Sequence, residues 1–106
     1  EIPIIVFPRG VGPSYKVFAN NKLFSGLAID TSIAPSWAKK ELQSKIVIQG
    51  NLDPELLVGE GLLLQKEVTD LLRQLNDGPY IFNLGHGITP RASPDNVQRI
   101  IEIIRG

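Results

Sequence analysis

The chain contains no cysteine, which excludes disulfide bonds, thiolate metal ligands and cysteine nucleophiles. This absence fits a reducing compartment such as the cytosol. Methionine is absent as well, and an apolar run begins at Ile2. We therefore expect these 106 residues to be a segment cut from a longer protein, with a processed small domain as the alternative.

Neither sign of charge is in excess, because Lys and Arg together number 11 and Asp and Glu also number 11. A nucleic-acid-binding protein usually carries a basic surplus, so no nucleic-acid partner is expected. No apolar run approaches the ~20 residues that a helix needs to span a bilayer, so no membrane partner is expected either. The length is enough for one domain with a modest hydrophobic core.

Short apolar runs alternate with helical patterns along the chain. The runs at residues 2–7, 26–29, 46–48 and 80–84 predict strands, and the first run predicts a strand buried on both faces. Helices are expected at residues 11–21, 35–43 and 62–75, and a last helix is expected to start at Ser93, with serine as its cap and Pro94 in its first turn. This order predicts an α/β fold of four parallel β-α units, either a small open sheet or half of an eight-stranded barrel.

The two longest predicted helices each carry one apolar stripe, as expected for helices that pack on a sheet. In the helix expected at residues 62–75, the stripe consists of Leu64, Val68, Leu71, Leu72 and Leu75. Those of the last helix are Val97, Ile100, Ile101 and Ile104.

Polar side chains follow the predicted strands, at the carboxyl ends where both candidate architectures place functional loops. They are Arg9, Asp30, Thr31, Ser32, Asn51, Asp53, Asn83 and His86. His86 is the only histidine, and it lies between two glycines directly after an apolar strand. Its imidazole is the side chain whose charge state is nearest to balance at neutral pH, and the glycines leave room for a ligand.

Two segments together resemble the last two strand-loop motifs of the uroporphyrinogen decarboxylase family: residues 49–54 (QGNLDP) and residues 82–88 (FNLGHGI). The one helix between them matches the family's spacing. Residues 7–12 and 27–30 resemble the ends of its fifth and sixth strands, and Pro90 with the residues that follow resembles the approach to its final helix. The resemblance covers essentially this whole chain, but only the C-terminal half of a TIM-type (β/α)8 barrel.

The resemblance implies a lyase of porphyrin and haem biosynthesis. Such an enzyme decarboxylates the four acetate side chains of uroporphyrinogen III to give coproporphyrinogen III, without a metal or an organic cofactor. The implied partners are the porphyrinogen substrate and, for the complete enzyme, a second copy in a cytoplasmic homodimer. The family's aspartate that bridges the pyrrole nitrogens belongs to the N-terminal half, which is missing here. The isolated chain is therefore expected to be inactive.

The resemblance also implies candidate substrate-binding residues. His86 matches the family's substrate-contacting histidine, so we expect it to bind a substrate carboxylate or to tune a nearby proton donor; a bond that merely caps its own loop is the alternative. Asn51 is a candidate for substrate contact, with a structural role as its alternative. The guanidinium groups of Arg9 and Arg91 suit a carboxylated ligand.

Structural roles are expected for four further residues. Asp30 ends the second strand and is expected to hold a neighbouring loop by accepting backbone N–H bonds. Asp53 precedes a proline, a common position for a turn or cap residue. Gly85 and Gly87 flank the histidine. No catalytic residue and no metal ligand is assigned within this chain.

Two other functions fit parts of the sequence. Gly10 and Gly12 lie ahead of a predicted helix, where backbone N–H groups of a small open α/β module could bind an anion or the phosphate of a nucleotide. Zinc-dependent methyltransferases share the barrel, but they bind zinc through thiolate and imidazole ligands. The chain has His86 where they place a cysteine, so this alternative fits poorly.

Overall fold

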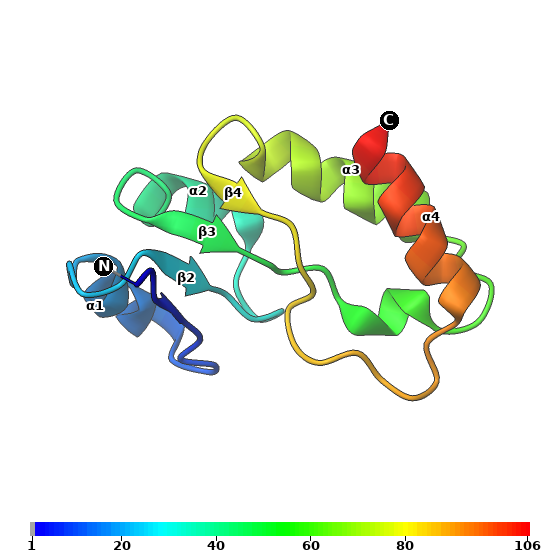
Figure 1. The fold of residues 1–106 in the computed structure, drawn as a ribbon, viewed down its shortest axis with the longest axis horizontal. Coiled ribbons are helices and arrows are strands. Elements are labelled where there is room, and N and C mark those ends of the chain that lie inside the picture. The colour runs from blue at the N-terminus through cyan, green and yellow to red at the C-terminus, as the bar shows by residue number, and fades with distance from the viewer. Residues whose placement is uncertain (1) are drawn as a thin grey trace.

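The structure is a computed structural model that describes residues 2–106. It contains four parallel strands in the order β1-β2-β3-β4, alternating with helices (Figure 1). The elements are β1 (Ile5–Val6), η1 (Gly12–Ser14), α1 (Tyr15–Ala19), β2 (Gly26–Ala28), α2 (Pro35–Glu41), β3 (Val47–Gln49), η2 (Pro54–Leu57), α3 (Leu64–Leu75), β4 (Tyr80–Ile81) and α4 (Pro94–Arg105). The predicted parallel α/β fold is confirmed. None of the described helices has the length and apolar character to cross a membrane.

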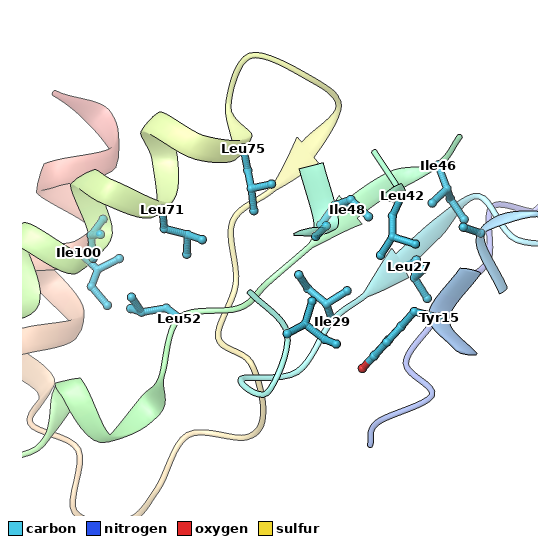
Figure 2. Close-up of a cluster of buried hydrophobic side chains, with 14 of the residues drawn as sticks. Tyr15, Leu27, Ile29, Leu42, Ile46, Ile48, Leu52, Leu71, Leu75 and Ile100 are labelled. Atoms are coloured by element: carbon cyan, nitrogen blue, oxygen red, sulfur yellow. The ribbon is translucent and has the colours of Figure 1, made fainter. Parts of the chain in front are cut away.

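The buried core lies between one face of the sheet and the helices (Figure 2). Leu27 and Ile48 pair across β2 and β3, and both are fully buried. Leu42, just after α2, and Leu75 of α3 close the core from the helical side. Each such side chain contributes about 1.5–3 kcal/mol on burial, so these contacts fix the sheet and therefore the positions of the strand ends.

The prediction that the first strand is buried on both faces is wrong. β1 has only two residues, and Ile5 is 47% exposed. Phe7 and Ile81 are also exposed, although their chain neighbours Val6 and Phe82 pack against the core. Side chains alternate between the faces of a strand, and the described part of the chain covers only one face of this sheet.

The apolar stripe of α3 is confirmed. Its buried members are Leu64, Val68, Leu71 and Leu75, and Leu72 is partly buried against the core. Asp70, on the same helix, lies outside the stripe and pairs with Lys66 and Arg73. These exposed pairs add little stability, so the stripe is what holds α3 in place.

The expected features of α4 are only partly correct. Ile100 is buried, but Ile104 is exposed, and Ile103 packs against the core in its place. Ser93 occupies the N-cap position without a side-chain capping hydrogen bond. Asn96 instead ties the first turn down, because its buried Nδ2 donates to backbone carbonyls of Leu57 and Gly59 at 2.9 and 3.0 Å.

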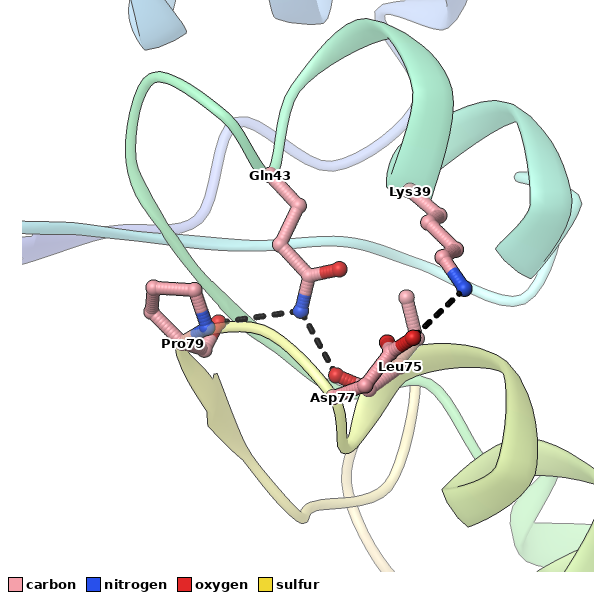
Figure 3. Close-up of polar contacts among 5 residues, drawn as sticks. All are labelled: Lys39, Gln43, Leu75, Asp77 and Pro79. Atoms are coloured by element: carbon pink, nitrogen blue, oxygen red, sulfur yellow. Dashed lines mark hydrogen bonds and ion pairs between the residues drawn. The ribbon is translucent and has the colours of Figure 1, made fainter.

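A buried amide fastens the amino-terminal end of the sheet (Figure 3). The Gln43 Nε2 donates to the carbonyl oxygens of Leu75 and Pro79, at 2.7 and 3.1 Å, and so links the end of α2 to the turn before β4. The neighbouring Lys39–Asp77 pair, at 3.0 Å, is exposed and contributes little. This end of the sheet is tied together internally, whereas the loops at the other end carry the candidate site.

Candidate functional site

The carboxyl ends of the parallel strands lie at one edge of the sheet, where the following loops meet (Figure 1). A cavity of about 530 Å³ opens there, on the face of the sheet that the helices leave uncovered. It is lined by Ile5, Phe7, Ala28, Gln49, Asn83, Leu84, His86, Gly87 and Ile88. The lining therefore combines apolar side chains with the amides of Gln49 and Asn83 and the imidazole of His86.

The His86 loop leaves β4 earlier than the apolar run suggested, since the regular strand ends at Ile81. A single parallel bridge between Leu52 and Leu84 extends the pairing with the β3 loop. His86 follows this bridge and is partly exposed. Within residues 2–106, no hydrogen bond engages its imidazole, including any to the backbone of its own loop. The nitrogens of the His86 imidazole are therefore available to hydrogen-bond a ligand in the cavity.

Gly85 allows the His86 loop to lie in close contact with the loops that follow β2 and β3. Its N–H donates to the Leu52 carbonyl at 2.8 Å. A Cβ at this position would lie 2.5 Å from Thr31 Cγ2, 2.9 Å from the Thr31 nitrogen and 3.2 Å from the Asn51 carbonyl oxygen. Only a residue without a side chain fits there, so Gly85 sets how closely the His86 loop approaches the β2 and β3 loops.

We predict that Gly85→Ala lowers the unfolding free energy by about 1–3 kcal/mol, the usual cost of overpacking, because the Thr31 nitrogen and the Asn51 carbonyl oxygen are backbone atoms that cannot rotate away. Gly87→Ala is the matched control, because a Cβ at Gly87 meets no atom within 4 Å. Urea denaturation of the two variants measures the difference. Equal midpoints would show that the loop contact at Gly85 is relaxed in solution.

Asp30 connects the loops that follow β1 and β2. Its Oδ2 accepts hydrogen bonds from the Gly10 N–H at 2.6 Å and the Tyr15 hydroxyl at 2.8 Å. Its Oδ1 accepts from the Ser32 N–H at 2.8 Å and from the Ser32 hydroxyl. Burial acts to raise the pKa of Asp30, but the bonds from Ser32, Gly10 and Tyr15 outweigh it and lower that pKa to about 2. The carboxyl group is therefore a stable anion and does not exchange protons near neutral pH.

Tyr15 stabilises the Asp30 carboxylate through a hydrogen bond from the core side. Its side chain is fully buried, and its hydroxyl both donates to Asp30 Oδ2 and accepts the Asp30 N–H at 3.2 Å. Burial and the neighbouring Asp30 carboxylate raise the pKa of Tyr15 well above its ordinary value. The hydroxyl thus remains a hydrogen-bond donor.

Asn51 connects the next pair of loops. The side chain is buried, and its Nδ2 donates to the Asp30 carbonyl at 2.8 Å and the Ile33 carbonyl at 2.7 Å. Both amide hydrogens are therefore used within the protein. Asn51 and Asp53 line a separate cavity of about 360 Å³ that also exposes the acidic groups of Glu67 and Asp70, an unfavourable environment for an anionic ligand.

Three other predicted site residues are not among those that line the His86 cavity: Asp53, Arg91 and Arg9. Asp53 caps η2 by accepting the Glu55 N–H at 2.9 Å. Arg91 pairs with the exposed Glu55 carboxylate at 2.8 Å. Arg9 is exposed on the turn after β1, two residues beyond the cavity residue Phe7. The structure thus brings His86 to the cavity with Asn83 and does not bring Arg91 there.

Sequence reasoning missed two features of this region. Tyr15 carries no local signal of its role, since its partner Asp30 is 15 positions away and is reached only through the pairing of β1 with β2. Gln49 lines the cavity because it alternates with the buried Ile48, a period-two signal that was available in the sequence.

Comparison with known proteins gives the family. A family model described as "Uroporphyrinogen decarboxylase (URO-D)" matches residues 1–106. The chain is 49% identical to a uroporphyrinogen decarboxylase of Paracoccus denitrificans, over 99% of this chain and 31% of that protein. It is 45% identical to that of Rhodospirillum rubrum, over 98% of this chain and 30% of that protein. The chain thus spans about a third of the length of these curated relatives, and it belongs to the uroporphyrinogen decarboxylase family.

Proposed function

We propose that this chain is the C-terminal part of a uroporphyrinogen decarboxylase, and that the whole enzyme converts uroporphyrinogen III to coproporphyrinogen III. The observation that carries the proposal is the position of the lone imidazole, His86, in a cavity at the carboxyl ends of parallel strands. Family membership over the whole chain supports it. The enzyme would serve porphyrin and haem biosynthesis.

The cavity lining suits a ligand that is apolar across its ring and anionic at its margin. Ile5, Phe7 and Ile88 offer apolar contact, and they are exposed in the described chain. Asn83 and His86 offer hydrogen-bond donors at the side of the cavity. A porphyrinogen combines an apolar macrocycle with a periphery of carboxylates, so it matches both parts of this lining.

The chemistry defines what the site must do. Loss of carbon dioxide breaks a carbon–carbon bond and leaves an electron pair on the former acetate methylene. A pyrrole protonated at the adjacent ring carbon accepts that pair, and a proton delivered to the methylene completes the methyl group. The ring carbon then loses its added proton, which restores the neutral pyrrole. The protein must stabilise the positive ring and direct the protons. We assign His86 a hydrogen bond to a substrate carboxylate or the tuning of a proton donor.

The complete enzyme needs groups that this chain does not supply. Within the family, the aspartate that anchors the pyrrole nitrogens comes from the N-terminal half. β1 and β4 form the two edges of the described sheet, and we propose that the N-terminal half pairs with them to close the barrel. The proposal includes a cytoplasmic homodimer that uses neither a metal nor an organic cofactor.

The phosphate-binding module is disfavoured. The Gly10 N–H, which would have to face a phosphate, donates to Asp30 Oδ2 at 2.6 Å instead. The helix that follows, α1, is only five residues long, so its amino end has little dipole to offer an anion.

The proposed function predicts activity in a chimera and none in the chain alone. In the chimera, this chain replaces the matching segment of the Paracoccus denitrificans relative. We expect it to release carbon dioxide from uroporphyrinogen III and form coproporphyrinogen III, measured by chromatography of the oxidised porphyrins. A folded chimera without activity, or decarboxylation by the isolated chain, would contradict the proposal.

A further inference from the structure

The Asp30 carboxylate is fully occupied by donors from within the protein. Gly10 and Tyr15 bond to Oδ2, and the backbone and side chain of Ser32 bond to Oδ1. A carboxylate offers about four lone-pair sites, so these four donors leave no room for another. An arginine nearby finds no acceptor on this anion.

Arg9 is that arginine. It immediately precedes Gly10, and its positive charge is close enough to contribute to the electrostatics of the Tyr15 hydroxyl. The side chain is exposed, and no carboxylate in the described part of the chain lies within ion-pair distance of it. By contrast, Arg73 and Arg91 both have carboxylate partners.

The turn that carries Arg9 is held rigidly. Gly10 has φ 82°, a left-handed conformation that favours glycine. Its N–H is fixed by the same Oδ2 that receives the Tyr15 hydroxyl. Tyr15 is in turn fully buried in the core, so the core sets the orientation of this turn. Phe7, two residues before Arg9, lines the His86 cavity, so the turn that carries Arg9 begins beside that cavity.

We propose that Tyr15 is a positioning residue which, by keeping Asp30 occupied, leaves the Arg9 guanidinium free to bind a carboxylate of the ligand. The inference rests on the proposed function, because it takes the ligand to be a polycarboxylated tetrapyrrole. Removal of the Tyr15 hydroxyl vacates one acceptor position on Oδ2, directly beside the Arg9 turn. Arg9 then pairs with Asp30, and this internal ion pair competes with the ligand.

The test is a double-mutant cycle in the chimera, since coupling energies separate residues that act through each other from residues that act independently. The variants are Tyr15→Phe, Arg9→Gln and the two combined. The readouts are the Kd for uroporphyrin, the stable oxidised octacarboxylate, and the KM and kcat for uroporphyrinogen III. Arg9→Gln is expected to raise Kd and KM roughly tenfold, the effect of losing one charge-assisted hydrogen bond.

Tyr15→Phe is expected to raise Kd and KM several-fold with little change in kcat, and to add nothing in the Arg9→Gln background. Tyr80→Phe is the matched control, because it removes the hydroxyl of another tyrosine, a partly buried one that donates to the Gly50 carbonyl instead. Any effect of that change should be the same with and without Arg9. Should Tyr15→Phe reduce the yield of folded protein, Ser32→Ala removes a donor to Oδ1 and is expected to show the same coupling to Arg9.

Two results would overturn the inference and leave the proposed function standing. In the first, the Arg9→Gln chimera has normal turnover and an unchanged Kd for uroporphyrin. In the second, Tyr15→Phe has the same effect in the presence of Arg9 as in the Arg9→Gln background. An unmutated chimera that binds uroporphyrin but releases no carbon dioxide would defeat the proposed function alone. In that case the binding cycle still decides the role of Tyr15.

Discussion

Asp30→Asn is expected to lower the unfolding free energy by about 3 kcal/mol, the loss typical of a buried hydrogen-bond network to a charged group. Each carboxylate oxygen of Asp30 receives one backbone N–H, from Gly10 on Oδ2 and from Ser32 on Oδ1. In asparagine, one of these oxygens becomes an NH₂ group. Whichever way the asparagine amide turns, its NH₂ group faces a backbone N–H, of Gly10 or of Ser32, in a buried site. Two donors then meet, because a backbone N–H cannot become an acceptor.

The same network predicts how stability depends on pH. Because the pKa of Asp30 is lowered from its usual 3.8 to about 2, its ionised form stabilises the folded state at every pH above 3.8. That contribution, about 2 kcal/mol, is lost progressively as the pH falls from near 4 towards 2. Urea denaturation between pH 2 and 7 should show this loss in the unmutated chimera and a smaller one in Asp30→Asn.

Asp53→Asn is the matched control for this prediction. Asp53 is also an aspartate in a strand-end loop, but it is exposed, and within the described residues it accepts a single hydrogen bond, from the Glu55 N–H, as the cap of η2. Asparagine serves as well as aspartate at such a position, so the expected change is below about 0.5 kcal/mol. Equal losses in the two variants would mean that the Asp30 network does not persist in solution.

Local patterns were enough to predict most of the fold. The period of apolar residues in α3 and the proline at the start of α2 and α4 gave helices close to the observed bounds. The apolar runs gave the positions of all four strands. Such signals depend only on residues within one or two turns of each other, and tertiary contacts here reinforce them.

The exposure of β1 could not be predicted in the same way. A continuous apolar run indicates that both faces of a strand will be covered, but it does not say which segment covers them. Ile5 and Phe7 lie on the face of the sheet that the described helices leave uncovered. Their apolar character is explained if a further part of the barrel packs there, as the proposed function requires.

The side-chain contacts of the loops were the least predictable feature. Polar residues after a strand can point to the rim or turn into a neighbouring loop, and the sequence is the same in both cases. Asn51 turns inward because the carbonyls of Asp30 and Ile33 need donors. Arg91 forms an ion pair with Glu55, which lies 36 positions away in the sequence. These outcomes depend on long-range geometry that only the assembled sheet defines.

His86→Ala in the chimera is expected to lower kcat for uroporphyrinogen III by roughly 100-fold, within the range for loss of a group that assists proton transfer. The fold should be unaffected, because the imidazole is partly exposed and makes no hydrogen bond within the described residues. Steady-state kinetics measure the first effect, and urea denaturation of the same preparations checks the second.

A second substitution separates the two roles assigned to this histidine. Asparagine keeps a hydrogen-bond donor and acceptor at the loop but cannot take up or release a proton near neutral pH. If His86 only binds a substrate carboxylate, His86→Asn should recover most of the lost kcat and keep the pH profile of the unmutated chimera. If it tunes a proton donor, His86→Asn should be as slow as His86→Ala and should flatten one limb of that profile. Unchanged kcat and KM in His86→Ala would remove the imidazole from the site altogether, and the cavity at the strand ends would then have to act through Asn83 and groups from the N-terminal half.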